Sequence, residues 1–381
     1  MINEYLKSYN KKYCNGCGIC TIGCPTNAIK MIEDNEGFYY PQIDEEKCIK
    51  CNKCKNICSN YNNSKGNEQT YMAINKNEEE LKKSASGGIF YIIARYVIEK
   101  HGVVFGVEYG KDLKVQHNYY ETLEDCQKFQ GSKYVRSDVG NSYEKVKEFL
   151  QQDRLVLFTG TPCQCNALKI YLKKEYKKLI LCDIICHANP SQKVFDKYIK
   201  EIEKQNDKKI VDVKFRDKTK GWKSSMPVIY FEDGSKIEDK IFYESFVAEL
   251  LDRPSCHECK FSAPDRITDF TIGDFWGINK IMPEMEDKNT GISLLSVNSQ
   301  KGKEIFDKIK SSMDFKEIDK ELAWKFNHNS NVPPHRNRQR FFDNFEKIPV
   351  IENMKICMKV SLLKKILRKG KYIAKKILKK L

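Results

Sequence analysis

Residues 14–25 read CNGCGICTIGCP and residues 48–58 read CIKCNKCKNIC, so one cysteine spacing occurs twice near the start of the chain. A 4Fe-4S cluster needs four thiolates from different directions. In this spacing the first three cysteines wrap around one cluster while the fourth reaches a second cluster. The repeat therefore predicts two crossed clusters. One predicted ligand set is Cys14, Cys17, Cys20 and Cys58, and the other is Cys48, Cys51, Cys54 and Cys24.

This stretch resembles the bacterial two-cluster ferredoxins. A zinc site would be expected to show Cys-x2-Cys pairs separated by longer gaps. A disulfide framework would need an oxidising compartment, whereas the chain opens MINEYLK, without an apolar export segment. One departure from the ferredoxin pattern is that Cys24 is followed by Pro25 but Cys58 by Ser59. This departure removes no predicted ligand.

The overall composition fits a metal-binding protein with room for further domains. A length of 381 residues suggests two or three domains. The chain has 16 cysteines, several of them outside the repeat. This number predicts a cytoplasmic protein whose cysteines stay reduced and serve as metal ligands. No run of about 18 apolar residues is present, so no transmembrane helix is expected.

The positive charge is concentrated at the C-terminal end. Residues 355–381 hold eleven lysines and arginines and no acidic residue, and subtracting these from the formal charge of +15 leaves +4. The remaining value is ordinary, so nucleic-acid binding is not expected. Because apolar residues alternate with the cations, residues 351–381 are predicted to form a basic amphipathic tail. Such a tail could lie on the inner face of a membrane, bind an acidic partner protein or remain solvated.

The domain boundaries follow from the polar run YNNSKGNEQ at residues 61–69, which is typical of a linker. The expected domains are residues 1–66, 67–350 and 351–381. The expected fold class is α+β or α/β: a small bacterial-type dicluster ferredoxin domain, a larger mixed-sheet domain and the tail. In the larger domain, apolar runs of strand length alternate with helical segments, including one expected at residues 242–251.

Several motifs lie where loops meet the expected strands and helices. Ser86, Gly87 and Gly88 precede a helix at residues 89–98, and a free helix start binds phosphate, although a serine cap is the favoured alternative. Gly131-Ser132-Lys133-Tyr134-Val135-Arg136 suits a diphosphate or an ordinary surface loop. Gly160-Thr161-Pro162-Cys163 and Cys186-His187 each follow an expected strand, at positions where α/β proteins build sites.

Taken in chain order, the motifs of the larger domain resemble the beta subunit family of coenzyme F420-reducing hydrogenase and related dehydrogenases. The similarity runs from about residue 71 to residue 345, and bacterial members commonly carry a fused ferredoxin domain. The motifs are Ser86-Gly87-Gly88, Gly131-Ser132-Lys133-Tyr134, Gly160-Thr161-Pro162-Cys163-Gln164, Cys186-His187, Pro190-Ser191, Arg253-Pro254-Ser255-Cys256-x2-Cys259 and Gly273-Asp274-Phe275-Trp276-Gly277.

The resemblance implies a non-Rossmann α/β domain that binds FAD beside a third 4Fe-4S cluster. From spacing alone, a structural zinc on the same thiols is equally expected. A glycine usually follows the Cys-His pair in the family, whereas this chain has Ala188 and then Asn189. The implied cluster ligands are Cys163, Cys186, Cys256 and Cys259, and the implied flavin contacts are Ser86, Gly87, Gly88, Gly131, Ser132, Lys133 and Thr161. Cys165 and Cys182 are possible substitute ligands, although buried free thiols are the favoured account of these two and of Cys126 and Cys357.

The expected function is that of an iron–sulfur flavoprotein oxidoreductase. Electrons would pass between the ferredoxin clusters and FAD to or from an organic acceptor, such as a deazaflavin or a substrate of cell-surface polysaccharide synthesis. The alternative is an electron-transfer adaptor that feeds a separate catalytic protein. A redox partner protein or a small electron donor is the expected partner. The sequence nominates no catalytic acid, because His187, Asp274 and Lys133 suit structural roles equally well.

Overall fold

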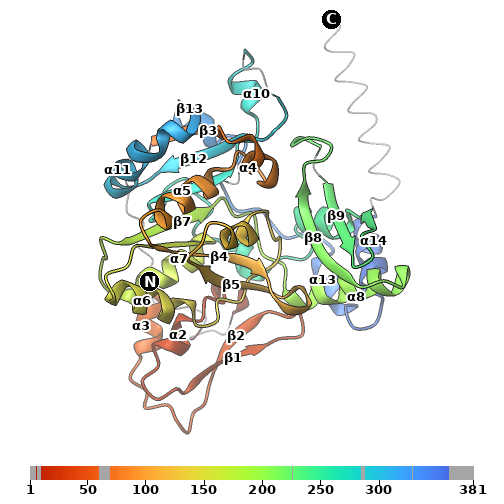
Figure 1. Ribbon diagram of the computed structural model, residues 1–381. Helices are drawn as coiled ribbons and strands as arrows, with labels where there is room; N and C mark the ends of the chain where they lie inside the picture. The colour runs from red at the N-terminus through yellow and green to blue at the C-terminus, as the bar shows by residue number, and fades with distance from the viewer. Residues whose placement is uncertain are drawn as a thin grey trace, which may run out of the picture.

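A computed structural model describes residues 6, 10–59, 69–224, 226–284, 288–327 and 329–359. Within these residues, an eight-stranded mixed sheet has the order β13-β3-β12-β11-β7-β6-β4-β5 (Figure 1). Its middle strands β4, β6, β7 and β11 are parallel, and the outer strands are antiparallel to their neighbours. The predicted mixed sheet is therefore confirmed. The strands are β3 (Gln69–Asn75), β4 (Val103–Tyr109), β5 (Val115–Tyr120), β6 (Val156–Gly160), β7 (Leu179–Ile184), β11 (Phe270–Asp274), β12 (Ser293–Val297) and β13 (Met313–Glu317).

Helices cover both faces of this sheet. Because successive strand residues point to opposite faces, Val104 packs beneath α5 and α11, whereas Val103 and Phe105 pack against α6 and α7. Both faces of the parallel strands are therefore buried, which explains their continuous apolar runs. The covering helices are α5 (Ile89–Ile98) and α11 (Gln300–Ile309) on one face, and α6 (Ser142–Gln151) and α7 (Pro162–Leu172) on the other.

A three-stranded antiparallel sheet, also formed by described residues, lies beside the main sheet. This sheet and the helices beside it share an aromatic core with Phe195, Phe215 and Phe242. The strands are β8 (Ile210–Asp217), β9 (Met226–Phe231) and β10 (Lys236–Glu238), and the helices that pack here are α8 (Gln192–Asn206), α9 (Ile241–Val247), α13 (Arg338–Asp343) and α14 (Val350–Met358).

The C-terminal boundary differs from the predicted one. Met354 and Cys357 of α14 are buried in the aromatic core, so the folded chain continues past residue 350. Residues 360–381 of the predicted tail, and most of the predicted linker at 61–69, lie outside the described residues. Among the helices that the structure describes, none is both long enough and apolar enough to cross a bilayer. The remaining short helices are α4 (Glu78–Lys83), α10 (Ile278–Ile281), α12 (Lys320–Trp324), η2 (Lys111–Leu113), η3 (Asp125–Phe129), η4 (Pro254–Glu258) and η5 (Lys310–Ser312).

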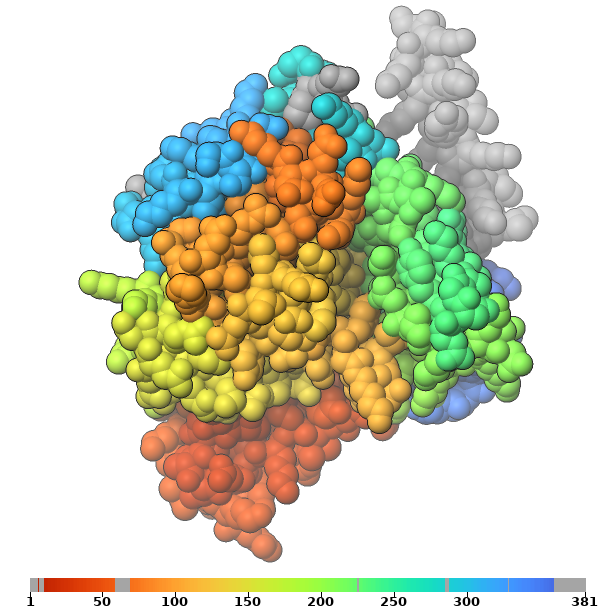
Figure 2. All heavy atoms as spheres, in the orientation of Figure 1, coloured from red at the N-terminus to blue at the C-terminus, as the bar shows by residue number. Residues whose placement is uncertain are grey.

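The N-terminal unit forms a lobe against the body of the molecule (Figures 1 and 2). A hairpin separates its two cysteine loops. Ile19 enters the apolar core beside Ala167 and Leu168 of α7, so the lobe and the body share a hydrophobic contact. The elements of the lobe are η1 (Lys11–Tyr13), α2 (Ile19–Ile22), β1 (Ile29–Glu33), β2 (Tyr39–Ile43) and α3 (Lys53–Ser59).

Buried arginines of the body also hold the lobe. Arg253 donates from Nε to the Cys14 carbonyl at 2.7 Å and from Nη2 to the Tyr39 carbonyl at 2.9 Å. Arg338 donates to both carboxylate oxygens of Glu36, at 2.6 and 3.2 Å. Paired, two-pronged contacts of this kind fix orientation as well as distance. The cysteine loops are therefore held in a defined position relative to the main sheet.

Candidate iron–sulfur and cofactor site

The structure brings together each set of thiols that the repeat predicts. Burial raises the pKa of the Cys20 thiol above its ordinary range, and the nearby Cys17, Cys14 and Cys58 raise it further. These four cysteines are the first predicted set. The second set, which is Cys24, Cys48, Cys51 and Cys54, lines a small cavity of about 30 Å³. The two predicted sets of four cysteines therefore gather at two separate places, as two crossed clusters require.

A third group of thiols gathers at the body. Cys163 follows β6 and Cys186 follows β7, and these neighbouring parallel strands end side by side. The short helix η4 carries Cys256, and Cys259 comes directly after it. Burial raises the pKa of Cys186 well above its ordinary value, and Cys256, Cys163 and Cys259 raise it further. The four cysteines implied by the family resemblance therefore lie close enough to interact.

The spacing of the thiols bears on which metal they could hold. A tetrahedral zinc ion with four thiolates at about 2.3 Å would bring the sulfurs to about 3.8 Å from one another. In the described part of the chain, no three cysteine sulfurs lie within 4.8 Å of one another. A 4Fe-4S cluster places each thiolate on a different iron and so needs a wider spacing. Four thiolates on a cluster therefore lie farther apart than four thiolates on one zinc ion.

Hydrogen-bond donors surround the third group of thiols. Arg136 donates from Nη1 to Cys163 Sγ at 3.3 Å, and the Phe261 backbone N–H donates to Cys259 Sγ at 3.4 Å. Asn189 donates from Nδ2 to Cys186 Sγ at 3.7 Å. Donors of this kind stabilise thiolate charge and tune the metal that it holds. The departure from the family at Ala188 and Asn189 therefore supplies a donor to a predicted ligand.

Arg136 also connects the third group to the N-terminal lobe. Its Nη2 donates to the Gly16 carbonyl, between Cys14 and Cys17, at 3.2 Å. Burial, with smaller contributions from Cys14 and Cys163, raises the pKa of Cys17 to about 11. The first ferredoxin set and the third group are thus neighbours. Arg136 was expected only in a diphosphate loop, and no local pattern predicts this contact, because the residues that Arg136 joins are more than a hundred positions apart.

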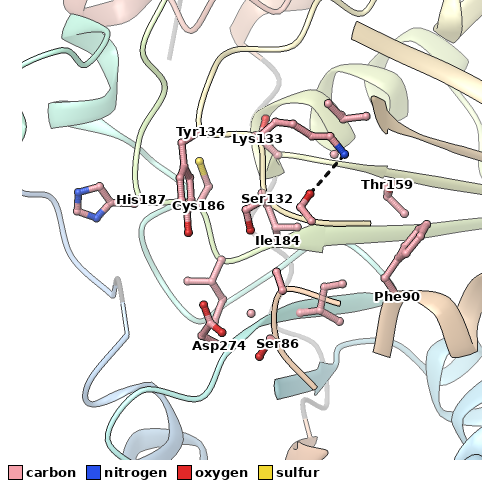
Figure 3. Close-up of a pocket in the computed structure, with 18 of the residues that line it drawn as sticks. Ser86, Phe90, Ser132, Lys133, Tyr134, Thr159, Ile184, Cys186, His187 and Asp274 are labelled. Atoms are coloured by element: carbon pink, nitrogen blue, oxygen red, sulfur yellow. Dashed lines mark hydrogen bonds between the residues drawn. The ribbon is translucent and has the colours of Figure 1, made fainter. Parts of the chain in front are cut away.

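A cavity of about 660 Å³ opens beside the third group of thiols (Figure 3). Six of the seven predicted flavin contacts line it: Ser86, Gly88, Gly131, Ser132, Lys133 and Thr161. Gly87 is the exception, and its N–H donates to Ser293 Oγ at 2.9 Å. Cys186 lines the same cavity. One cysteine therefore belongs both to the third group and to the cavity wall.

The start of α5 faces this cavity. The favoured serine cap is wrong, because the N-cap is Gly88, with a φ of +77°, and no side chain of the described residues caps the helix. Ser86 instead donates from Oγ to the Ile292 carbonyl at 2.8 Å. Gly88, Ile89 and Phe90 line the cavity. Backbone N–H groups at such a helix start bind phosphate and other anions.

Lys133 and Thr161 each organise a wall of the cavity. Lys133 Nζ donates to the carbonyls of Lys128 at 2.9 Å and Gln130 at 3.0 Å, and so orders its own loop. Burial lowers the pKa of Lys133 to about 8. Thr161 is the N-cap of α7 and forms a capping box with Gln164. Its Oγ1 also lies 3.2 Å from Cys163 Sγ, which connects the cavity wall to the thiols.

The remaining candidates have structural partners. His187 Nε2 lies 2.6 Å from Glu249 Oε1. Asp274 accepts hydrogen bonds from Trp222 Nε1 at 2.7 Å and from Arg216 at 3.4 Å. The thiols of Cys126, Cys165, Cys182 and Cys357 are buried, as predicted.

Comparisons with known proteins find similarity in two parts of the chain. The family model of the 4Fe-4S dicluster domain matches residues 13–61. The model of the C-terminal region of the coenzyme F420 hydrogenase/dehydrogenase beta subunit matches residues 153–321. No curated protein matches the chain. A chain of the xenon-derivatised F420-reducing NiFe hydrogenase complex from Methanosarcina barkeri is 21% identical, with 75% of this chain and 90% of that chain covered and a TM-score of 0.45. Residues 153–321 therefore match the C-terminal domain of the coenzyme F420 hydrogenase/dehydrogenase beta subunit and residues 13–61 a 4Fe-4S dicluster domain, so the chain is an iron–sulfur electron-transfer protein of the oxidoreductase type that is related to this subunit.

Proposed function

We propose that this chain is an iron–sulfur flavoprotein oxidoreductase. Electrons would travel between two ferredoxin clusters, a third cluster and FAD in the large cavity, and from there to or from an organic acceptor. The observation that carries this proposal is the position of Cys186, which lies in the third group of thiols and in the cavity wall at once. A cluster held there would adjoin a ligand in the cavity.

The cavity suits FAD in size and in chemistry. Its volume of about 660 Å³ lies in the usual range for cofactor sites, and its walls combine apolar side chains with a few polar groups. The uncapped start of α5 and the charge of Lys133 offer a place for the diphosphate. When bound, a flavin accepts electrons singly and transfers them in pairs, which matches one-electron clusters to two-electron substrates.

The residues around the thiols support a continuous electron path. Cys163 lies near enough to Cys17 to add to its raised pKa, which supports a short separation between the first ferredoxin set and the third group. Arg136 donates to Cys163 and to the Gly16 carbonyl, and so holds both loops. Arg253 anchors the same lobe through the Cys14 carbonyl. These contacts keep the redox sites at a fixed separation, which is the main task of a protein that conducts electrons.

The mouth of the cavity favours an organic acceptor. Four large apolar side chains that line the cavity are exposed to solvent, namely Ile184, Val247, Trp276 and Phe326. Exposed apolar groups clustered around a cavity commonly mark a ligand or partner site. A deazaflavin or a substrate of cell-surface polysaccharide synthesis is an acceptor of the proposed class. The adaptor role, in which a partner protein docks here, uses the same surface.

Anaerobic purification with cofactor analysis tests the proposal. We expect about twelve irons, a similar number of labile sulfides and one FAD per chain, from three clusters of four irons. About eight irons together with zinc would refute the third cluster, and the absence of flavin would refute the flavoprotein assignment. If FAD is present and is reduced by a one-electron donor, but small acceptors are turned over only after a partner protein is added, the chain is the adaptor rather than the complete enzyme.

A further inference from the structure

Behind the predicted cluster ligands lies a second group of side chains that could hold a metal ion. One ligand atom each of His187, Glu249 and Asp252 lies within 4.8 Å of the others. His187 follows Cys186 directly, whereas Glu249 and Asp252 come just before the segment that carries Cys256. Two chain segments that supply predicted cluster ligands therefore meet at these three side chains.

Asp252 is the unusual member of this group. Its relative exposure is 0%, and no described residue donates a hydrogen bond to either of its carboxylate oxygens unless a proton is shared with Glu249. Glu249, beside it, is also buried. Burial raises the pKa of Asp252 well above its ordinary value, and the neighbouring Glu249 raises it further. Two adjacent buried carboxylates are costly unless a proton or a cation lies between them.

We propose that His187, Glu249 and Asp252 bind one divalent transition-metal ion. An imidazole nitrogen with two carboxylate oxygens is a ligand set that manganese, iron and zinc ions accept. A doubly charged cation would neutralise both carboxylates and give the oxygens of Asp252 a ligand. The set contains no thiol, so it differs in chemistry from the three cysteine groups and favours a harder ion than they do.

The surroundings of the group suit a metal site. The Asp252 carbonyl accepts from Arg338 Nε at 2.8 Å, and the Glu249 carbonyl accepts from the His335 N–H at 3.1 Å, so the backbone of both ligands is anchored. His187 lines the large cavity on the same side as Cys186, and its side chain is partly exposed (Figure 3). The cavity therefore offers an ion a path to the group, as a metal site requires.

An ion at this position would act as a cross-link. It would join the loop after β7, which carries Cys186, to the segment before η4, which carries Cys256. The inference concerns ligands outside the cysteine groups, and so it stands or falls independently of flavin binding and of the proposed electron path.

Titration of the full, anaerobically purified chain with Mn²⁺ tests the site, because this ion prefers carboxylates to thiolates. After desalting, total iron, manganese and zinc are measured against acid-labile sulfide, which counts the clusters separately. We expect the parent chain to hold about one more ion than the Asp252→Asn variant, and the affinity of the variant for Mn²⁺, followed by electron paramagnetic resonance, to be at least about tenfold lower. The amide keeps the size of the side chain and can donate to Glu249.

Glu244→Gln is the matched control, since Glu244 lies on α9 in an exposed pair with Lys240 at 2.9 Å and should leave Mn²⁺ binding unchanged. Equal metal content and equal Mn²⁺ affinity in the parent and in Asp252→Asn would overturn the proposal. Folding of Asp252→Asn is judged by its sulfide content and visible spectrum. If that variant does not fold, His187→Gln is compared with the parent chain instead, and equal metal binding by His187→Gln and the parent overturns the proposal.

Discussion

The N-terminal cysteines and the third group of thiols are built in different ways. The eight N-terminal cysteines repeat one short spacing, and glycines at positive φ, such as Gly16 at +67° and Gly18 at +74°, let the loop turn tightly between them. The third group comes from β6, β7 and η4, which lie far apart in the sequence and meet only in the folded sheet. One site is encoded by local spacing, and the other by topology.

The difference extends to the surroundings of the sulfurs. In the N-terminal lobe Cys20 is buried but Cys51 and Cys58 are exposed, whereas every thiol of the third group is partly buried. Arg136 and Asn189 supply side-chain hydrogen bonds to the third group. A buried thiolate needs such donors more than an exposed one, because water cannot solvate it. We therefore expect the third site to be the more sensitive of the two to changes in side chains around it.

The largest effect should follow from Cys186→Ser. Loss of this thiolate should lower the iron content from about twelve to about eight per chain, since only the proposed third cluster would depend on it. Because Cys186 also lines the cavity, reduction of flavin by an external one-electron donor should slow by at least about 100-fold. Iron and sulfide analysis with stopped-flow absorption measures both effects.

Cys165→Ala is the control for that change. Cys165 lies on α7, two residues from Cys163, and is fully buried. The variant should keep all the iron, with only a modest loss of stability. If Cys186→Ser retains about twelve irons, or if Cys165→Ala loses four, the third ligand set is wrong.

The contrast also explains what could be predicted from the sequence. Spacing alone indicated the two N-terminal sets, and Cys163 and Cys186 were placed correctly at strand ends, because parallel strands bring their carboxyl ends together. The contacts of Arg253 and Arg338 with the lobe were not predicted. They join residues more than 200 positions apart, and no local pattern marks them.

Two local predictions failed for a related reason. The serine cap on α5 was wrong because Ser86 finds its partner at Ile292, on a distant segment. The helix expected at residues 242–251 ends at Val247, because Glu249 adopts a φ of +63°. That conformation is unfavourable for a residue other than glycine and persists only when tertiary contacts impose it.

A smaller effect should come from separating the lobe from the body. Glu36 and Arg338 are both largely buried, so Arg338→Ala should lower the apparent free energy of unfolding by about 2–4 kcal/mol. Combined with Glu36→Ala, a double-mutant cycle should give a coupling energy of about 1–3 kcal/mol. Bleaching of cluster absorbance in denaturant provides the measurement. The exposed pair of Lys145 and Glu148 should couple by less than about 1 kcal/mol, and equal couplings for the two pairs would show that the arginine contact does not hold the lobe.

The smallest effect concerns the charge of Lys133 on the cavity wall. Its pKa of about 8 means that the ammonium carries its charge below pH 8 and loses it above. Affinity for FAD should therefore fall as the pH rises from 8 to 9, because the diphosphate loses a nearby cation. In Lys133→Met the affinity should be about tenfold lower at pH 7 and nearly independent of pH over this window. Fluorescence titration of flavin-free protein measures both.

Stability should respond to pH in the opposite direction. Since the folded chain lowers the pKa of Lys133 from 10.5, the unfolded chain binds more protons between pH 8 and 10.5, and the contribution of this group to the free energy of unfolding rises across that window. Lys128→Met removes a cation from the protein surface nearby and should change neither trend. If both variants bind FAD with the pH dependence of the parent chain, the charge that attracts the diphosphate lies elsewhere, and the start of α5 becomes the main anion site of the cavity.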